Sequence, residues 1–200
     1  MTKILQIKTS IFLNQGWSSR LSDELVEALK TKFDAPEVVI RDLAQNPIPH
    51  LDASGFLAFL EKPESRSPGQ QALVAASDKL VEELKSSDIV VIGLPLYNLD
   101  IPSTLKSWFD QISRAGVTFS FTEQGVKGLL SDRKVYLVAT RGGIYSGTPL
   151  DTQSAFVRNF FGLIGITDLE FIYAEGMNMG DDPQAAGLAS ARAHIARIGG

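Results

Sequence analysis

Asp88–Leu94 reads DIVVIGL, and this stretch decides the fold class. It is a continuous apolar run with Gly93 near its end. A strand with one face in water alternates apolar and polar residues, whereas a strand covered on both faces is apolar throughout. Strands of the second kind belong to parallel sheets with helices on both sides. We therefore predict a central, parallel strand here.

Segments of two kinds alternate on both sides of this run. Short apolar stretches predict further strands at Lys3–Lys8, Glu37–Ile40, Lys134–Thr140 and Leu169–Ala174. Apolar residues at helical spacing predict helices at Ser18–Phe33, Gly69–Ser86, Pro102–Arg114, Thr152–Leu163 and Ala185–Ile198. The alternation predicts an α/β protein, and five strands suit a flavodoxin-like, doubly wound parallel sheet of order 2-1-3-4-5. We expect residues 1–200 to form a single domain.

Local patterns refine this prediction. Ser18, Ser19 or Ser22 is a suitable cap for the first helix. In the helix at 69–86, Leu73, Ala76, Leu80, Val81 and Leu84 share one predicted apolar face. Residues 44–68 hold four prolines, which favours irregular structure with a short helix around Ser54–Leu60. Thr118–Thr122 alternates and is expected to pair with Val126–Leu130 in a hairpin.

The composition excludes several classes of protein. The 200 residues include no cysteine, which excludes disulfides, iron–sulfur clusters, thiolate zinc sites and cysteine nucleophiles. The net charge is −4 without any Lys/Arg-rich run, so we expect no nucleic-acid partner. No apolar run approaches the ~20 residues of a membrane span, and polar residues interrupt the N-terminal run, so we expect neither membrane insertion nor a signal peptide. A cytoplasmic protein is the expectation.

Motifs of other catalytic classes are absent. The sequence has no G-x-G-x-x-G, no P-loop and no G-x-S-x-G elbow. His50 and His194 are expected to face solvent, and neither has the spacing of a metal-binding pair, so we expect no metal site. Asp181-Asp182 before Pro183 is typical of a helix start.

Ligands of parallel sheets bind beyond the carboxyl ends of the strands. The relevant loops are Thr9–Trp17, Pro95–Pro102 and Thr140–Thr148. The first leads hydroxyl groups into a helix N-terminus, which suits a phosphate held by neutral donors, although the same serines can simply cap the helix. In the second, Tyr97 and Asn98 can line a planar heterocycle or form an ordinary type I turn.

In the third loop, Gly142-Gly143 permits close approach to a flat ligand, although a flexible turn is the commoner meaning of such a pair. Taken together, Ser10 with Gly16-Trp17-Ser18, Pro95-Leu96-Tyr97-Asn98 and Thr140-Arg141-Gly142-Gly143 resemble the three FMN-contacting loops of the FMN-dependent NADH-azoreductases. Flanking segments such as Ser113–Phe119 (SRAGVTF) and Ala174-Glu175-Gly176 carry the similarity over nearly the whole chain.

The resemblance implies a homodimer with one FMN per subunit. It implies that two electrons pass from NADH or NADPH by ping-pong hydride transfer to quinones and aromatic azo compounds, cleaving the azo bond. Ser10 and Gly16–Ser18 would hold the phosphate of FMN, and the isoalloxazine would be framed by Leu96, Tyr97, Asn98, Leu99, Thr140, Arg141, Gly142 and Gly143. Trp17, Leu96, Leu99 and Thr140 depart from the residues common in that family.

With FMN carrying the chemistry, no catalytic acid or nucleophile is required. The Gly142 and Gly143 amides, together with Arg141, are candidates to stabilise negative charge on the reduced flavin. Aromatic side chains of Phe119, Phe121 and Tyr145 are candidates to line the acceptor site. The alternative functions are an electron-carrier flavodoxin without a substrate of its own, for which −4 is a modest charge, and a flavin-free structural α/β protein.

Overall fold

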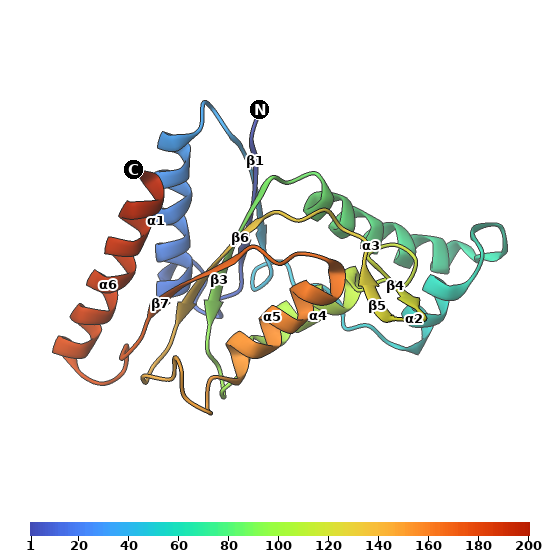
Figure 1. Ribbon diagram of the computed structural model, residues 1–200. Coiled ribbons are helices and arrows are strands. Elements are labelled where there is room, and N and C mark those ends of the chain that lie inside the picture. Colours follow the sequence, from blue (N-terminus) through green and yellow to red (C-terminus); the bar gives the residue numbers. More distant parts are fainter.

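The computed structural model describes residues 1–200 and contains an all-parallel sheet of order β2-β1-β3-β6-β7 (Figure 1). The strands of this sheet are β1 (Lys3–Lys8), β2 (Glu37–Asp42), β3 (Ile89–Pro95), β6 (Lys134–Thr140) and β7 (Leu169–Ala174). The helices are α1 (Trp17–Lys32), α2 (Ala53–Leu60), α3 (Pro68–Lys85), α4 (Ser103–Ile112), α5 (Thr152–Ile164) and α6 (Asp181–Gly199). The predicted fold and strand order are confirmed.

The central position of β3 explains its continuous apolar sequence. It pairs in parallel with β1 on one side and with β6 on the other, and all seven of its residues are buried. Val90 and Ile92 belong to a core shared with α3, α4 and α5, whereas Ile89 and Val91 belong to a core shared with α1 and α6. Because successive side chains of a strand point to opposite faces, both sets must be apolar.

Two helical layers enclose the sheet (Figure 1). The helices α1 and α6 lie side by side on one face and contact each other. On the other face, α4 and α5 pack through aromatic rings, with Phe109 stacked on Phe160 at a centroid distance of 3.8 Å. The layers leave the carboxyl edge of the sheet free, and the loops at that edge build the site described below.

The structure corrects the start of α1. The N-cap is Gly16, and no side chain caps the helix. Ser18, Ser19 and Ser22 lie inside the helix and are buried, so none of these serines is the predicted cap. Because the glycine at the N-cap has no side chain, the first N–H groups of α1 have no side-chain acceptor.

Three smaller expectations have different outcomes. The predicted apolar face of α3 is wrong at Leu73 and Ala76, which are exposed, because the buried stripe runs instead through Val74 and Ser77. The hairpin is confirmed as β4 (Phe119–Thr122) paired with β5 (Gly125–Gly128). Helix α6 begins at Asp181, in agreement with the predicted helix start. No helix has both the length and the apolar character needed to cross a bilayer.

Candidate functional site

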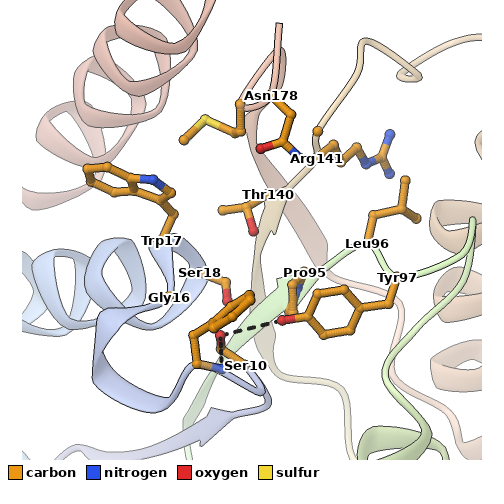
Figure 2. Close-up of a pocket in the computed structure, with 13 residues that line it drawn as sticks. Ser10, Gly16, Trp17, Ser18, Pro95, Leu96, Tyr97, Thr140, Arg141 and Asn178 are labelled. Atoms are coloured by element: carbon orange, nitrogen blue, oxygen red, sulfur yellow. Dashed lines mark hydrogen bonds between the residues drawn. The ribbon is translucent and has the colours of Figure 1, made fainter. Parts of the chain in front are cut away.

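A pocket opens at the carboxyl edge of the sheet, beyond β1, β3 and β6. Most of the predicted site residues line it: Ser10, Gly16, Trp17, Ser18, Leu96, Tyr97, Thr140, Arg141 and Gly142. Pro95, from the predicted second loop, also lines it, and three further lining residues were not predicted: Phe12, Met177 and Asn178. Asn98, Leu99 and Gly143 lie outside the lining. Three loops far apart in the sequence thus meet around one cavity (Figure 2).

The first loop brings Ser10 against Gly16. A Cβ placed on Gly16 would lie 2.0 Å from Ser10 Oγ, so only glycine permits this approach. Ser10 Oγ accepts a hydrogen bond from the backbone N–H of Phe12 at 3.2 Å. The N–H groups of the first turn of α1 lie beside it, uncapped by any side chain. Hydroxyl groups and free N–H groups at a helix N-terminus form a site for an anion.

The second loop is a strained hairpin. Tyr97 and Asp100 exchange backbone hydrogen bonds of 3.1 and 3.0 Å. The two residues between them, Asn98 and Leu99, have φ angles of 52° and 64°. Positive φ at both positions is incompatible with the type I turn considered from the sequence. The conformation turns Asn98 and Leu99 away from the cavity and leaves Tyr97 in its wall.

Tyr97 joins the first and second loops. Its hydroxyl accepts the N–H of Ile11 at 3.3 Å and lies 3.5 Å from Ser10 Oγ. Figure 2 shows the ring of Tyr97 across the cavity from Trp17. The guanidinium of Arg20 lies over the Trp17 ring at 5.0 Å. The cavity therefore has aromatic groups on two sides and small polar groups at its base.

The structure corrects the predicted role of Arg141. Its guanidinium is fully buried and points away from the space between Trp17 and Tyr97 (Figure 2). It forms ion pairs with Asp151 at 2.7 Å and Glu175 at 3.3 Å. Only the backbone side of Arg141 borders the cavity, so its charge is committed to these carboxylates and is not directed at a ligand in the pocket.

The Asp151 carboxylate has a perturbed pKa. Burial raises this pKa, but hydrogen bonds donated by Arg141 and by Ser154 lower it more, and the net direction is downward. The carboxylate is thereby held ionised, which suits an ion pair with Arg141. This pair is a structural feature behind the pocket.

Met177 and Asn178 belong to a fourth loop, which follows β7. Its backbone bonds to the loop after β6: Met177 N–H donates to Arg141 C=O at 3.0 Å, and Asn178 N–H donates to Gly142 C=O at 2.9 Å. A Cβ on Gly142 would lie 2.8 Å from Asn178 Nδ2. The sequence signal for this loop was the end of the last strand, which a parallel sheet places at the same edge as the others.

None of the three aromatic residues predicted to line the acceptor site, Phe119, Phe121 and Tyr145, lines this pocket, and their place at the acceptor site stays a prediction. Phe119 and Phe121 lie in the β4–β5 hairpin and do not line this pocket. Tyr145 covers Gly143, where a Cβ would lie 2.9 Å from the Tyr145 ring.

The two histidines do not both lie free in solvent. His50 is exposed, but its Nδ1 is 2.9 Å from Ser107 Oγ, whereas His194 is half-buried and its Nε2 is 2.8 Å from Glu170 Oε1. No group of three or more His, Cys, Asp or Glu side chains is placed to hold a metal ion.

Comparison with known proteins gives a consistent result. Residues 2–198 match a family described by a flavodoxin-like fold. An FMN-dependent NADH:quinone oxidoreductase of Cellvibrio japonicus is 51% identical over 195 residues, 98% of this chain and 97% of that protein. One of the same description from Alcanivorax borkumensis is 50% identical over 192 residues, 96% of this chain and 97% of that protein.

The chain belongs to the family of FMN-dependent NADH:quinone oxidoreductases. A solved structure agrees with this assignment. The azoreductase from Bacillus anthracis superposes with a TM-score of 0.90 at 28% identity, covering 100% of this chain and 99% of that one. The resemblance found in the three loops is thus confirmed at the level of the family.

Proposed function

We propose that residues 1–200 act as one flavin-binding domain that reduces quinones and aromatic azo compounds with NADH, using FMN as cofactor. The observation that carries the proposal is the uncapped N-terminus of α1 beside Ser10, at one end of a cavity lined by strand-end backbone and aromatic rings. The family relatives described as FMN-dependent NADH:quinone oxidoreductases support the cofactor, the donor and the quinone. The azoreductase at 28% identity supports azo compounds as further acceptors.

The donor set fits the phosphate end of FMN. A phosphate monoester needs several N–H or O–H donors, and the Ser10 and Ser18 hydroxyls lie beside the free N–H groups of α1. A side chain at Gly16 would collide with the Ser10 hydroxyl and fill the space beside it. The positive end of the helix dipole adds an attraction of about 0.3–1 kcal/mol for an anion at an exposed site.

The remaining lining fits a flat ring. Leu96, Tyr97, Thr140 and Gly142 present backbone and compact side chains from adjacent strands β3 and β6. Leu96 N–H bonds to Thr140 C=O at 2.9 Å, so the two loops meet at a fixed separation. When bound, FMN supplies the redox chemistry by taking a hydride from NADH and passing two electrons to the acceptor.

The protein itself binds FMN, orients the substrates against it and excludes water. Among the lining side chains only those of Tyr97 and Arg141 are titratable, and the Arg141 guanidinium is paired elsewhere. Tyr97 therefore carries the one titratable side chain of the lining that is not held in an ion pair. A donor and an acceptor that use the same face in turn give ping-pong kinetics.

We also propose that the active form is a homodimer in the cytoplasm. Exposed apolar side chains surround the pocket edge of the molecule: Ile11, Phe12, Leu13, Leu99, Ile144 and Leu150. Single exposed apolar residues are ordinary, but several on loops at one edge favour an interface. A second subunit on this edge would cover the open side of the cavity and keep water from the ring.

One experiment tests the proposal. Purified protein is saturated with FMN and separated from unbound FMN, its visible spectrum is recorded, and NADH is added under nitrogen, followed by a quinone or an azo dye. We expect a flavin spectrum, bleaching by NADH and reoxidation by either acceptor, with parallel double-reciprocal plots. Bleaching without turnover would favour an electron carrier, and a colourless protein would exclude flavin binding. Sedimentation at the activity-assay concentration tests the dimer, which a fully active monomer would contradict.

A further inference from the structure

Four consecutive polar residues, Asp151-Thr152-Gln153-Ser154, form the N-cap and the start of α5 and are here named the anchoring turn. None of them lines the pocket. Gln153 is fully buried, and its amide donates to Pro95 C=O at 3.0 Å and to Asp100 C=O at 3.2 Å. A single side chain thus bonds to both ends of the loop that carries Tyr97.

This loop needs such support. Asn98 and Leu99 have positive φ angles, and non-glycine residues in that region cost about 1–3 kcal/mol each. Strained backbone persists only where its surroundings determine it. The Gln153 amide fixes the two ends of the loop, and the Thr152 hydroxyl donates to Leu99 C=O at its tip.

The same turn holds the loop after β6. Asp151 and the Ser154 hydroxyl accept hydrogen bonds from Arg141 Nη2 at 2.7 and 2.8 Å. The other terminal nitrogen of Arg141 pairs with Glu175, which also accepts the backbone N–H groups of Tyr145 and Ser146, each at 2.8 Å. The anchoring turn is thus bonded to both strand-end loops that form the ring-binding side of the pocket.

The anchoring turn and the Arg141 side chain that it binds each contain a buried polar atom without a hydrogen-bond partner. Gln153 Oε1 and Arg141 Nε are two of the five buried side-chain polar atoms without a hydrogen-bond partner. An unpaired buried polar atom costs about 1–3 kcal/mol. An apolar residue of the same size at 153 would avoid that cost at Oε1. Buried polar atoms without partners are expected where a function requires the residue that carries them. Here the two N–H donors of the Gln153 amide are required to hold the loop of Tyr97.

We propose that Gln153 is a positioning residue, and that the anchoring turn sets the separation between the loop of Tyr97 and the loop of Gly142. This inference rests on the proposed function, because those two loops are the ones assigned to the flavin ring. The turn acts through backbone position and touches neither cofactor nor acceptor. Its loss should loosen ring binding more than it lowers global stability.

The first test compares FMN affinity with thermal stability. Gln153→Met keeps the size of the side chain and removes both donors. Ser67→Ala is the control, because Ser67 caps α3 with a capping box and lies outside the pocket. We expect Gln153→Met to raise the FMN Kd at least tenfold with little change in Tm, and Ser67→Ala to lower Tm with the Kd unchanged. A Kd for Gln153→Met within twofold of the parent, or a Tm loss that accounts for the whole effect, would overturn the proposal.

The second test needs no cofactor. Amide hydrogen exchange is measured on the FMN-free protein, its Gln153→Met variant and the milder Thr152→Val variant at an exposed position. We expect faster exchange at the Tyr97 and Asp100 amides in both variants, since their hairpin loses its anchor. Unchanged exchange in both would refute the anchoring role. If the parent protein fails to bind FMN, the proposed function fails, while this measurement still decides whether the turn anchors the loop.

Discussion

Gly16→Ala tests the phosphate end of the pocket most directly. A Cβ on Gly16 would lie 2.0 Å from Ser10 Oγ and 2.7 Å from Ser10 Cβ, well inside normal contact. The first loop must therefore move by about an ångström, and overpacking of this kind costs about 1–3 kcal/mol. For a chain of this size, each kcal/mol lowers Tm by about 2–4 °C. We expect a Tm loss of roughly 2–12 °C.

The effect on FMN should exceed the effect on stability. Moving the Ser10 hydroxyl and the Gly16–Ser18 backbone by about an ångström should break at least one charge-assisted hydrogen bond to the phosphate, which contributes about 1.5–3 kcal/mol. At 1.4 kcal/mol per factor of ten, we expect the FMN Kd to rise about 10- to 150-fold. Fluorescence titration of FMN measures the Kd, and calorimetry measures Tm.

Two further variants separate packing from binding. Gly162→Ala in α5 is the matched control, because a Cβ there meets nothing within 4 Å. It should stabilise by roughly 0.5–1 kcal/mol and leave the FMN Kd unchanged. Ser10→Gly added to Gly16→Ala removes the collision and should recover Tm, but FMN binding should stay weak because the hydroxyl is lost. Parent-like FMN affinity in Gly16→Ala alone would refute the phosphate assignment.

Three other predictions concern charge and fluorescence. Hydrogen bonds from Thr167 hold the pKa of Asp132 at about 2, below its ordinary 3.8. The stabilisation of the folded state by the ionised Asp132 is therefore complete above the unfolded pKa and disappears as pH falls through about 2. Urea titration should show Asp132→Asn less stable than the parent at neutral pH, with the difference vanishing near pH 2. Arg141→Ala leaves two half-buried carboxylates unpaired and should lower the free energy of unfolding by about 3–5 kcal/mol, and a neutral result would contradict the ion-pair assignment. Trp17 lines the pocket whereas Trp108 is buried in the core, so FMN should quench Trp17 and the quenching should diminish strongly in Trp17→Phe.

Several elements follow from local sequence alone. The apolar run at β3 and the helical spacing of Leu21, Leu25 and Leu29 reflect burial on both faces of a sheet and on one face of a helix. The alternation of strands and helices, with five strands, favoured the flavodoxin-like strand order, and parallel sheets bind ligands at the carboxyl edge. Three candidate loops at that edge were predicted, and the structure brings all three to one pocket.

The directions of side chains depended on tertiary contacts. Arg141 belongs to a loop resembling a flavin site, yet its side chain forms ion pairs with Asp151 and Glu175. No pattern in the sequence indicates that these two carboxylates are its partners. Gln153 gave no sequence signal, because its role depends on carbonyl groups more than fifty residues away.

The sequence by itself determined the helical layers and the edge that carries the site, because burial and chirality act on patterns that are local in the chain, and it favoured the flavodoxin-like strand order. Only the tertiary structure decided that Gly16 leaves α1 uncapped, that Asn98 and Leu99 hold positive φ angles, and that the first turn of α5 anchors two loops. These features depend on the positions of individual carbonyl and carboxylate groups from distant segments, and such positions exist only after the segments have packed together.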